Sequence, residues 1–183
     1  MTGRVVVIGV GNPLRGDDGV GPAVVEALRG RVPDDTVLAV GDGEPGRMLE
    51  LWRDADTVVV VEALRVCPAR PGALHTLTAT GAARGTRGAA STHAMSLGEC
   101  LALAEALDLL PRRVVVHGVE VAEIELGTGL SETVRAALPE LIERVAASVR
   151  HACEGNRRRH APGCERLLEP LWRPDQGRGP YGP

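Results

Sequence analysis

The sequence has no phenylalanine and no lysine, and aromatic residues make up only 2% of its 183 residues. A core therefore has to be built from aliphatic side chains, and a hydrophobic content of 44% supplies enough of them for a single globular domain. The longest apolar runs fall well short of the roughly 18 residues that a membrane-spanning helix needs. We also expect no signal peptide, because the first predicted strand begins within the first few residues and no charged region leads into it. We therefore expect no membrane association.

Paired cysteines and a basic surface are lacking as well. The four cysteines form no C-x-x-C pair, which favours a reducing compartment and a cytoplasmic protein with free thiols. The net charge is −3, and the segment from Arg150 onward is rich in arginine, so the rest of the chain is acidic. A nucleic-acid-binding domain would instead present a basic face on its folded part. We expect no nucleic-acid partner and a monomeric protein.

What the chain does contain is a distinctive stretch near its start. Residues 5–10 form an apolar, mostly β-branched run that predicts a buried strand. A loop of glycine, asparagine and proline follows, carries the adjacent acids Asp17 and Asp18, and leads into a helical pattern. A strand–loop–helix unit of this kind places its loop at the carboxyl edge of a parallel sheet, where open α/β folds bind their ligands.

Two interpretations of this loop remain open at the level of the sequence. A glycine-rich loop before a helix can bind phosphate through backbone N–H groups, but the dinucleotide pattern G-x-G-x-x-G fails at Leu14 and no Gly-Lys-Ser/Thr follows. The negative charges of the two acids would repel a phosphate, and they are better suited to binding a metal cation or to acid–base chemistry. Asp17 could equally be structural, because aspartate commonly caps helices.

Apolar runs alternate with helical patterns along the rest of the chain. Further strands are predicted at residues 36–40, 56–62, 71–78 and 113–119, and helices at 22–28, 47–53, 96–107, 131–138 and 139–151. The link before residues 71–78 is too short for a crossover helix, so that strand should be antiparallel. We therefore predict an α/β fold, namely a doubly wound, mostly parallel five-stranded sheet with helices on both faces and one antiparallel edge strand.

The pattern predicts one domain and a tail. Residues 1–152 carry the alternating pattern, whereas from Cys153 the chain is dominated by arginine, glycine and proline. We predict that residues 153–183 form a disordered basic tail, and that residues 80–90 form a loop. His75 and His117 are interpreted as structural; His117 interrupts an apolar strand and would at most lie behind the residues that line the crevice.

Three polar residues stand out by position. Asp18 follows the first strand, Glu62 directly abuts the valine run 58–61 and is predicted to end the third strand, and His93 lies just before a predicted helix. All three can converge at the carboxyl edge of the sheet. Two carboxylates and an imidazole can bind a divalent transition metal with positions left open for substrate. Burying Glu62 beside valines would cost several kcal/mol unless it is paired or bound.

The stretch from Gly9 to Gly21 closely resembles the opening motif of the hydrogenase maturation endopeptidases, which trim the C-terminal extension from the large subunit of nickel-containing hydrogenases. Residues 91–97 resemble the histidine motif of that family, and residues 118–121 and 125–131 resemble its C-terminal signature. The resemblance covers roughly residues 4–149.

The resemblance implies a peptidase that recognises a metal ion carried by its substrate before it cleaves. Asp18, Glu62 and His93 fall at the positions of the family's metal ligands, so they are expected to bind the nickel of the hydrogenase precursor. Asp18 and Glu62 are also the expected catalytic residues, although an aspartate is more usual at position 62. The attacking water could be activated either by the metal or by one of these carboxylates.

Two other functions stay open. A chaperone or checkpoint protein would bind the same precursor without cutting it. A small-ligand or nucleotide-binding α/β module would account for the glycine loop, but the acids in that loop oppose it.

Overall fold

The valine-rich runs form a sheet through the centre of the molecule. The computed structural model describes residues 3–78, 89–91, 97–122, 124, 126–127 and 129–159. The parallel strands are β1 (Val5–Val10), β2 (Thr36–Gly41), β3 (Thr57–Val66) and β6 (Arg113–Glu120). Strand β4 (Leu74–Thr78) pairs antiparallel with β6 at one edge. The predicted mostly parallel sheet with an antiparallel edge strand is confirmed.

The order of the strands places a topological switch point beside β1. The sheet runs β2-β1-β3-β6-β4, so the chain moves from β1 to β2 on one side and then crosses to β3 on the other. Such a reversal separates the connections that leave the carboxyl ends of the neighbouring strands, and open α/β sheets bind their ligands at this point. The loop that carries Asp17 and Asp18 emerges from β1 here.

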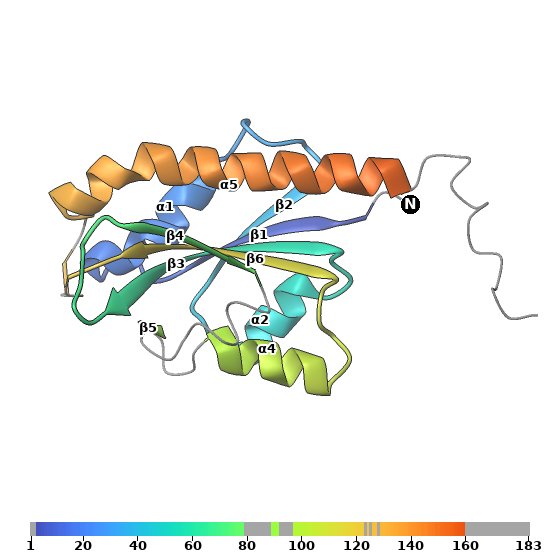
Figure 1. Ribbon diagram of the computed structural model, residues 1–183, viewed down its shortest axis with the longest axis horizontal. Coiled ribbons are helices and arrows are strands. Elements are labelled where there is room, and N and C mark those ends of the chain that lie inside the picture. The colour runs from blue at the N-terminus through green and yellow to red at the C-terminus, as the bar shows by residue number, and fades with distance from the viewer. Residues whose placement is uncertain are drawn as a thin grey trace, which may run out of the picture.

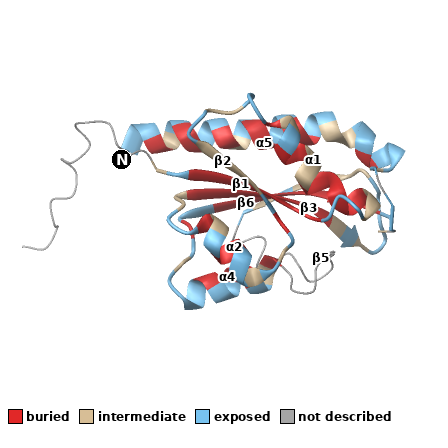
Figure 2. Cartoon of the chain, turned by 180° about the vertical axis from the view of Figure 1, so that it is seen from behind, coloured by how far each residue is buried: buried red, intermediate tan, exposed pale blue. Residues whose placement is uncertain are grey.

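Helices cover both faces of the sheet, as predicted. Helices α1 (Val20–Ala27) and α5 (Glu132–Arg159) lie on one face, and α2 (Pro45–Trp52) and α4 (Leu97–Ala106) lie on the other (Figure 1). The central strands are buried between these layers (Figure 2). Without phenylalanine, the core consists mainly of valine, leucine and alanine, with Trp52 and Met48 on the α2 side. In the part of the chain that is described, no helix combines the length and apolarity needed to cross a membrane.

The glycines of the first motif allow α1 to pack directly on the backbone of β1. A Cβ atom on Gly9 would lie 2.2 Å from the carbonyl oxygen of Gly21, and one on Gly21 would lie 2.3 Å from that of Val10. Gly11 has φ +140°, and a Cβ there would lie 1.8 Å from the carbonyl oxygen of Asp18. The glycines are therefore explained by close packing of the chain on itself, which weakens the phosphate-binding interpretation.

Strand β3 is longer than predicted, which corrects the placement of Glu62. Glu62 lies inside the strand and does not end it, because β3 continues to Val66. The pairing with β1 stops at Val61, but β6 pairs on as far as Leu64 and a short antiparallel strand, β5 (Ala89–Ser91), pairs with residues 64–66. Strand β5 partly overlaps the segment that we predicted to be a loop.

A single helix, α5, replaces the two C-terminal helices that were predicted. It runs from Glu132 to Arg159 with Pro139 inside it. Buried residues on both sides of the proline, including Val134 and Leu141, hold the helix to the sheet, and this packing offsets the backbone hydrogen bond that proline cannot make. The helix also passes residue 152, where the regular pattern was predicted to end. Residues 160–183 lie outside the described residues.

Helix α5 is attached at both ends of the sheet. At the carboxyl edge, the backbone N–H of Ser131, just before the helix, donates to Asp17 Oδ1 at 2.6 Å. At the opposite end, Asn156 Nδ2 donates to the carbonyl oxygen of Gly3 at 2.6 Å, and Arg159 pairs with Asp56 at 3.2 Å. The last helix therefore holds the beginning of the chain at two distant points.

Candidate functional site

The two adjacent acids of the first loop have different surroundings. They lie in a short 3-10 helix, η1 (Gly16–Gly19), and both are buried. Asp17 binds the N–H of Ser131 and so ties the loop to the start of α5, which favours the structural interpretation of this residue. Asp18 is only 1% exposed, and its Oδ2 accepts a hydrogen bond of 3.0 Å from the N–H of Asn12. That bond fixes the Asp18 carboxylate at the end of β1.

Glu62 is buried on the face of the sheet that α4 covers. Its side chain is 3% exposed, and it follows Val58 and Val60, which pack against α2 and α4, in the strand alternation. Burial, followed by the negative charge of Glu62, raises the pKa of the Cys100 thiol on α4 to about 11. The electrostatic effect on Cys100 agrees with this orientation of Glu62 toward α4.

Asp18 and Glu62 come from elements that meet at the switch point beside β1. The 3-10 helix η1 contacts β3, and a Cβ atom on Gly21 would lie 2.8 Å from the carbonyl oxygen of Val61, the residue before Glu62. His93 lies outside the described residues. Within those that are described, no group of three or more His, Cys, Asp and Glu side chains could hold a metal ion, and the predicted ligand set of Asp18, Glu62 and His93 stays a prediction.

A fourth buried carboxylate, Glu120, was missed by the sequence analysis. It is 1% exposed at the end of β6 and accepts hydrogen bonds from the N–H of Arg70 at 2.6 Å and from His75 Nε2 at 2.7 Å. The N–H of Arg70, with a smaller effect of His75, holds the pKa of Glu120 below its usual range against the opposing effect of burial. The local signal was weaker than at Glu62, because His117 and Gly118 separate the valines at 114–116 from Val119 and Glu120.

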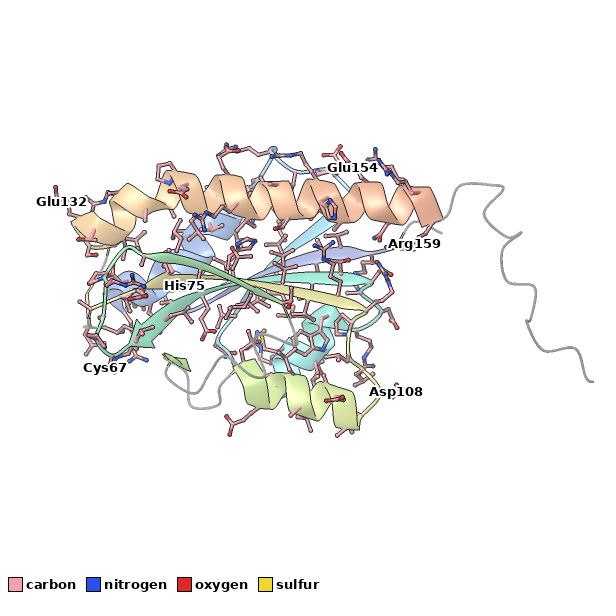
Figure 3. The ribbon with its side chains drawn as sticks, in the orientation of Figure 1. Cys67, His75, Asp108, Glu132, Glu154 and Arg159 are labelled. Atoms are coloured by element: carbon pink, nitrogen blue, oxygen red, sulfur yellow. The ribbon has the colours of Figure 1, made fainter. Side chains whose placement is uncertain are left out.

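The pair formed by His75 and Glu120 joins β4 to β6, and the same Glu120 holds the β3–β4 link through the N–H of Arg70. Figure 3 shows His75 on β4, with Cys67 and Glu132 at the carboxyl edge of the sheet and Arg159 and Asp108 at the opposite end. Glu62 and His75 both pair with Gly118 of β6 from opposite sides. The pair therefore belongs to the end of the sheet that carries the candidate site.

His117 belongs to the core on the opposite face from Glu62. Its ring nitrogens bind Thr76 Oγ1 at 3.1 Å and Ser148 Oγ of α5 at 2.9 Å, and it is 2% exposed. Burial, with a smaller effect of the Arg144 charge, lowers the pKa of His117 from 6.5 to about 4. These contacts support the structural interpretation.

His117 should make the protein lose stability as the pH falls. The unfolded state takes up a proton near pH 6.5, whereas the folded state does so only near pH 4. The stabilisation is therefore complete above pH 6.5 and is lost progressively below it, by about 2 kcal/mol between pH 7 and pH 5. Urea unfolding at both pH values should show this loss, and His117→Gln should remove it. Ser148→Ala keeps the imidazole of His117 and should still lose stability between pH 7 and pH 5. If His117→Gln loses as much stability over this range as the wild type, groups other than His117 are responsible for the pH dependence.

The chain is similar in sequence to known proteins over most of its length. The family model described as hydrogenase maturation protease matches residues 22–148. The hydrogenase 2 maturation protease of Escherichia coli (strain K12) is 26% identical over 151 residues, which cover 81% of this chain and 92% of that protein. The hydrogenase expression/formation protein HupM of Azotobacter chroococcum mcd 1 is 34% identical over 146 residues, which cover 75% of this chain and 69% of that protein.

Solved structures agree with the fold described above. The hydrogenase maturating endopeptidase HybD from E. coli has a TM-score of 0.70 and 26% identity, and the match covers 81% of this chain and 93% of that one. The maturation protease HybD from Thermococcus kodakarensis, at 23% identity, has a TM-score of 0.67 over 80% of this chain and 99% of that one.

A doubly wound α/β domain with buried acids at its switch point, together with these relatives, defines a peptide-hydrolysing enzyme. The chain belongs to the hydrogenase maturation protease family. The resemblance noted from the first motif is thereby confirmed.

Proposed function

We propose that this enzyme removes the C-terminal extension of a hydrogenase large-subunit precursor that already carries nickel. The observation that carries the proposal is the burial of two carboxylates, Asp18 and Glu62, on elements that meet at the switch point of the sheet. Relatives named hydrogenase maturation proteases support the substrate class. In this proposal Asp18, Glu62 and His93 bind the nickel of the substrate.

The burial of the acids suits recognition of a cation that arrives with the substrate. Charges shielded from water attract a docking cation more strongly than exposed charges do. An imidazole at position 93 would complete a ligand set typical of nickel and related metals. A precursor without metal would gain none of this attraction and should bind poorly.

Hydrolysis requires a water to attack the scissile carbonyl carbon and the leaving amine to gain a proton. Asp18 or Glu62 can accept the proton of that water as a general base and then give it to the leaving amine. The substrate nickel can instead lower the pKa of the water, with one carboxylate holding the cation and the other passing the proton of the water to the leaving amine. Both routes need the same two residues, either as the base or as ligands of the cation.

We further propose that the enzyme acts as a monomer in the cytoplasm. The cysteines of the described part, Cys67, Cys100 and Cys153, are free, as is usual in a reducing compartment. Sedimentation at the mass of one chain, 19.2 kDa, is the expected result for the oligomeric state, and sedimentation as a dimer would contradict it.

The test is cleavage of a purified precursor in two forms, one loaded with nickel and one without. We expect mass spectrometry to show a single shortened large subunit and the released C-terminal peptide only for the loaded form. Equal cleavage of both forms would overturn nickel recognition. Stable binding without any shortened product would instead support a checkpoint protein, and tight binding of a nucleotide with no response to the precursor would support a ligand-binding module.

A further inference from the structure

A surface hollow lies beside the acidic loop, at the carboxyl edge of the sheet. It has a volume of about 790 Å³, within the range of sites that bind small molecules or peptide segments. Its lining comes from segments far apart in the sequence: the motif loop at Gly16 and Asp17, the β3–β4 link at Ala69 and Pro71, and the segment before α5 at Ser131.

Buried carboxylates hold two sides of this hollow in place. Asp17 accepts the N–H of Ser131 at 2.6 Å and fixes the side that leads into α5. Glu120 accepts the N–H of Arg70 at 2.6 Å and fixes the link that contributes Ala69 and Pro71. Hydrogen bonds to charged groups are stronger than those between neutral groups, so the hollow is a preformed feature of the fold.

A third side is attached directly to the motif loop. The N–H of Gly16 donates to the carbonyl oxygen of Gly127 at 2.9 Å, and the N–H of Gly127 donates to that of Leu14 at 3.1 Å. Leu14 and Leu126 are 63% and 88% exposed, so two apolar side chains project from the paired segments that border the hollow. Exposed apolar groups beside a preformed hollow are typical of a binding surface.

The lining selects the chemistry of the occupant. Apart from Asp17, the described lining residues are glycine, alanine, proline, leucine, serine and threonine. This set includes no cation that would favour a phosphate or an acidic ligand. Its small side chains leave room for an extended backbone, and its leucines can contact an apolar side chain. The lining therefore fits an uncharged polypeptide segment.

The position of the hollow relates it to the reaction. Asp17 lines it, and the Cα atom of Asp18, the next residue, is about 3.8 Å from that of Asp17. Asp17 binds the start of α5 on one face of the sheet, whereas Glu62 faces α4 on the other. The hollow therefore lies one residue along the chain from Asp18, the carboxylate that the proposed function places at the reaction.

We propose that this hollow binds an extended, uncharged segment of the substrate polypeptide next to the scissile bond. The inference rests on the proposed function, because it takes the precursor as the occupant. It adds a second point of recognition, separate from the nickel and formed largely by backbone and small side chains. Binding of nickel would select the precursor that already carries its metal, and binding in the hollow would position the scissile peptide bond.

Filling the hollow tests the proposal. Ala69→Trp and Ala122→Trp place a large side chain at exposed positions of its lining, and each should raise KM for the nickel-loaded precursor at least tenfold while kcat changes less than threefold. Ala147→Trp, on the exposed side of α5, is the matched control and should keep the wild-type KM. Melting temperatures of all three should agree with the wild type.

A KM within twofold of the wild type for both filling variants would overturn the proposal. A second measurement uses precursors in which an uncharged residue beside the scissile bond is replaced by aspartate; the wild-type enzyme should bind these at least tenfold more weakly, and equal binding would also overturn it. If the wild-type enzyme does not cut the loaded precursor, the proposed function fails. The same variants compared by calorimetric Kd for that precursor then still decide whether the hollow is a binding site.

Discussion

Replacing Asp18 by asparagine, or Glu62 by glutamine, is expected to lower kcat for the nickel-loaded precursor by about 10²- to 10⁴-fold, the range that removal of a general base costs. Each change removes one charge and keeps the size of the side chain. The amide oxygen of the introduced asparagine could still accept the hydrogen bond that the N–H of Asn12 donates to Asp18 Oδ2, so the fold should be preserved. The double variant Asp18→Ala, Glu62→Ala should release no product.

The appearance of the shortened large subunit over time, followed by mass spectrometry, checks this expectation. Glu50→Gln is the matched control, because it removes an exposed acid from α2 and should cleave at the wild-type rate. Circular dichroism should show that every variant is folded. Unimpaired processing by the double variant would remove both residues from the proposed site.

Replacing Gly21 by alanine is expected to destabilise the protein by at least about 4 kcal/mol, an amount that single substitutions reach only through severe overpacking or comparable damage. The added Cβ would lie 2.3 Å from the carbonyl oxygen and 2.7 Å from the nitrogen of Val10, and 2.8 Å from the carbonyl oxygen of Val61. All three are backbone atoms of central strands, so α1 would have to move away from the sheet.

Gly155→Ala is the matched control for that substitution. Gly155 lies in α5, and a Cβ there would meet only Arg159, at 3.7 Å. Alanine favours the helix over glycine by up to about 1 kcal/mol, so this variant should melt at or above the wild-type temperature. Chemical unfolding of both proteins gives the comparison. A Gly21→Ala variant as stable as the wild type would show that the loop has another packing arrangement.

The arrangement of the sheet could be predicted because local signals agreed with one another. Valine runs mark the strands, and the short proline-containing link before β4 required an antiparallel edge strand. The length of β3 could not be predicted, because Glu62 interrupts an apolar run and the pairing that continues the strand comes from β5 and β6, which are distant in sequence. Two C-terminal helices were predicted because proline usually ends a helix. The structure has one helix, since the packing of residues on both sides of Pro139 outweighs this local preference.

The candidate site could be predicted only in part. Asp18 was found because the motif around it is specific, and Glu62 because a carboxylate after four valines needs an explanation. The division of roles within the acidic pair could not be predicted, since the Ser131 N–H that binds Asp17 lies more than a hundred residues away along the chain. Glu120 was overlooked because His117 and Gly118 interrupt the valine run before it, and because its partners, Arg70 and His75, come together only in the folded sheet.

The attachment of α5 at both ends of the sheet bears on how the enzyme matures during its own synthesis. The oxygen of Asp17 receives its partner, the N–H of Ser131, only after most of the chain has been made. The carbonyl oxygen of Gly3 likewise gains its hydrogen bond only after Asn156 has been synthesised. A nascent chain whose residues 131 and 156 are still in the ribosomal tunnel would carry its acidic motif without the scaffold that fixes it, so we expect proteolytic competence to arise only after Asn156 has emerged.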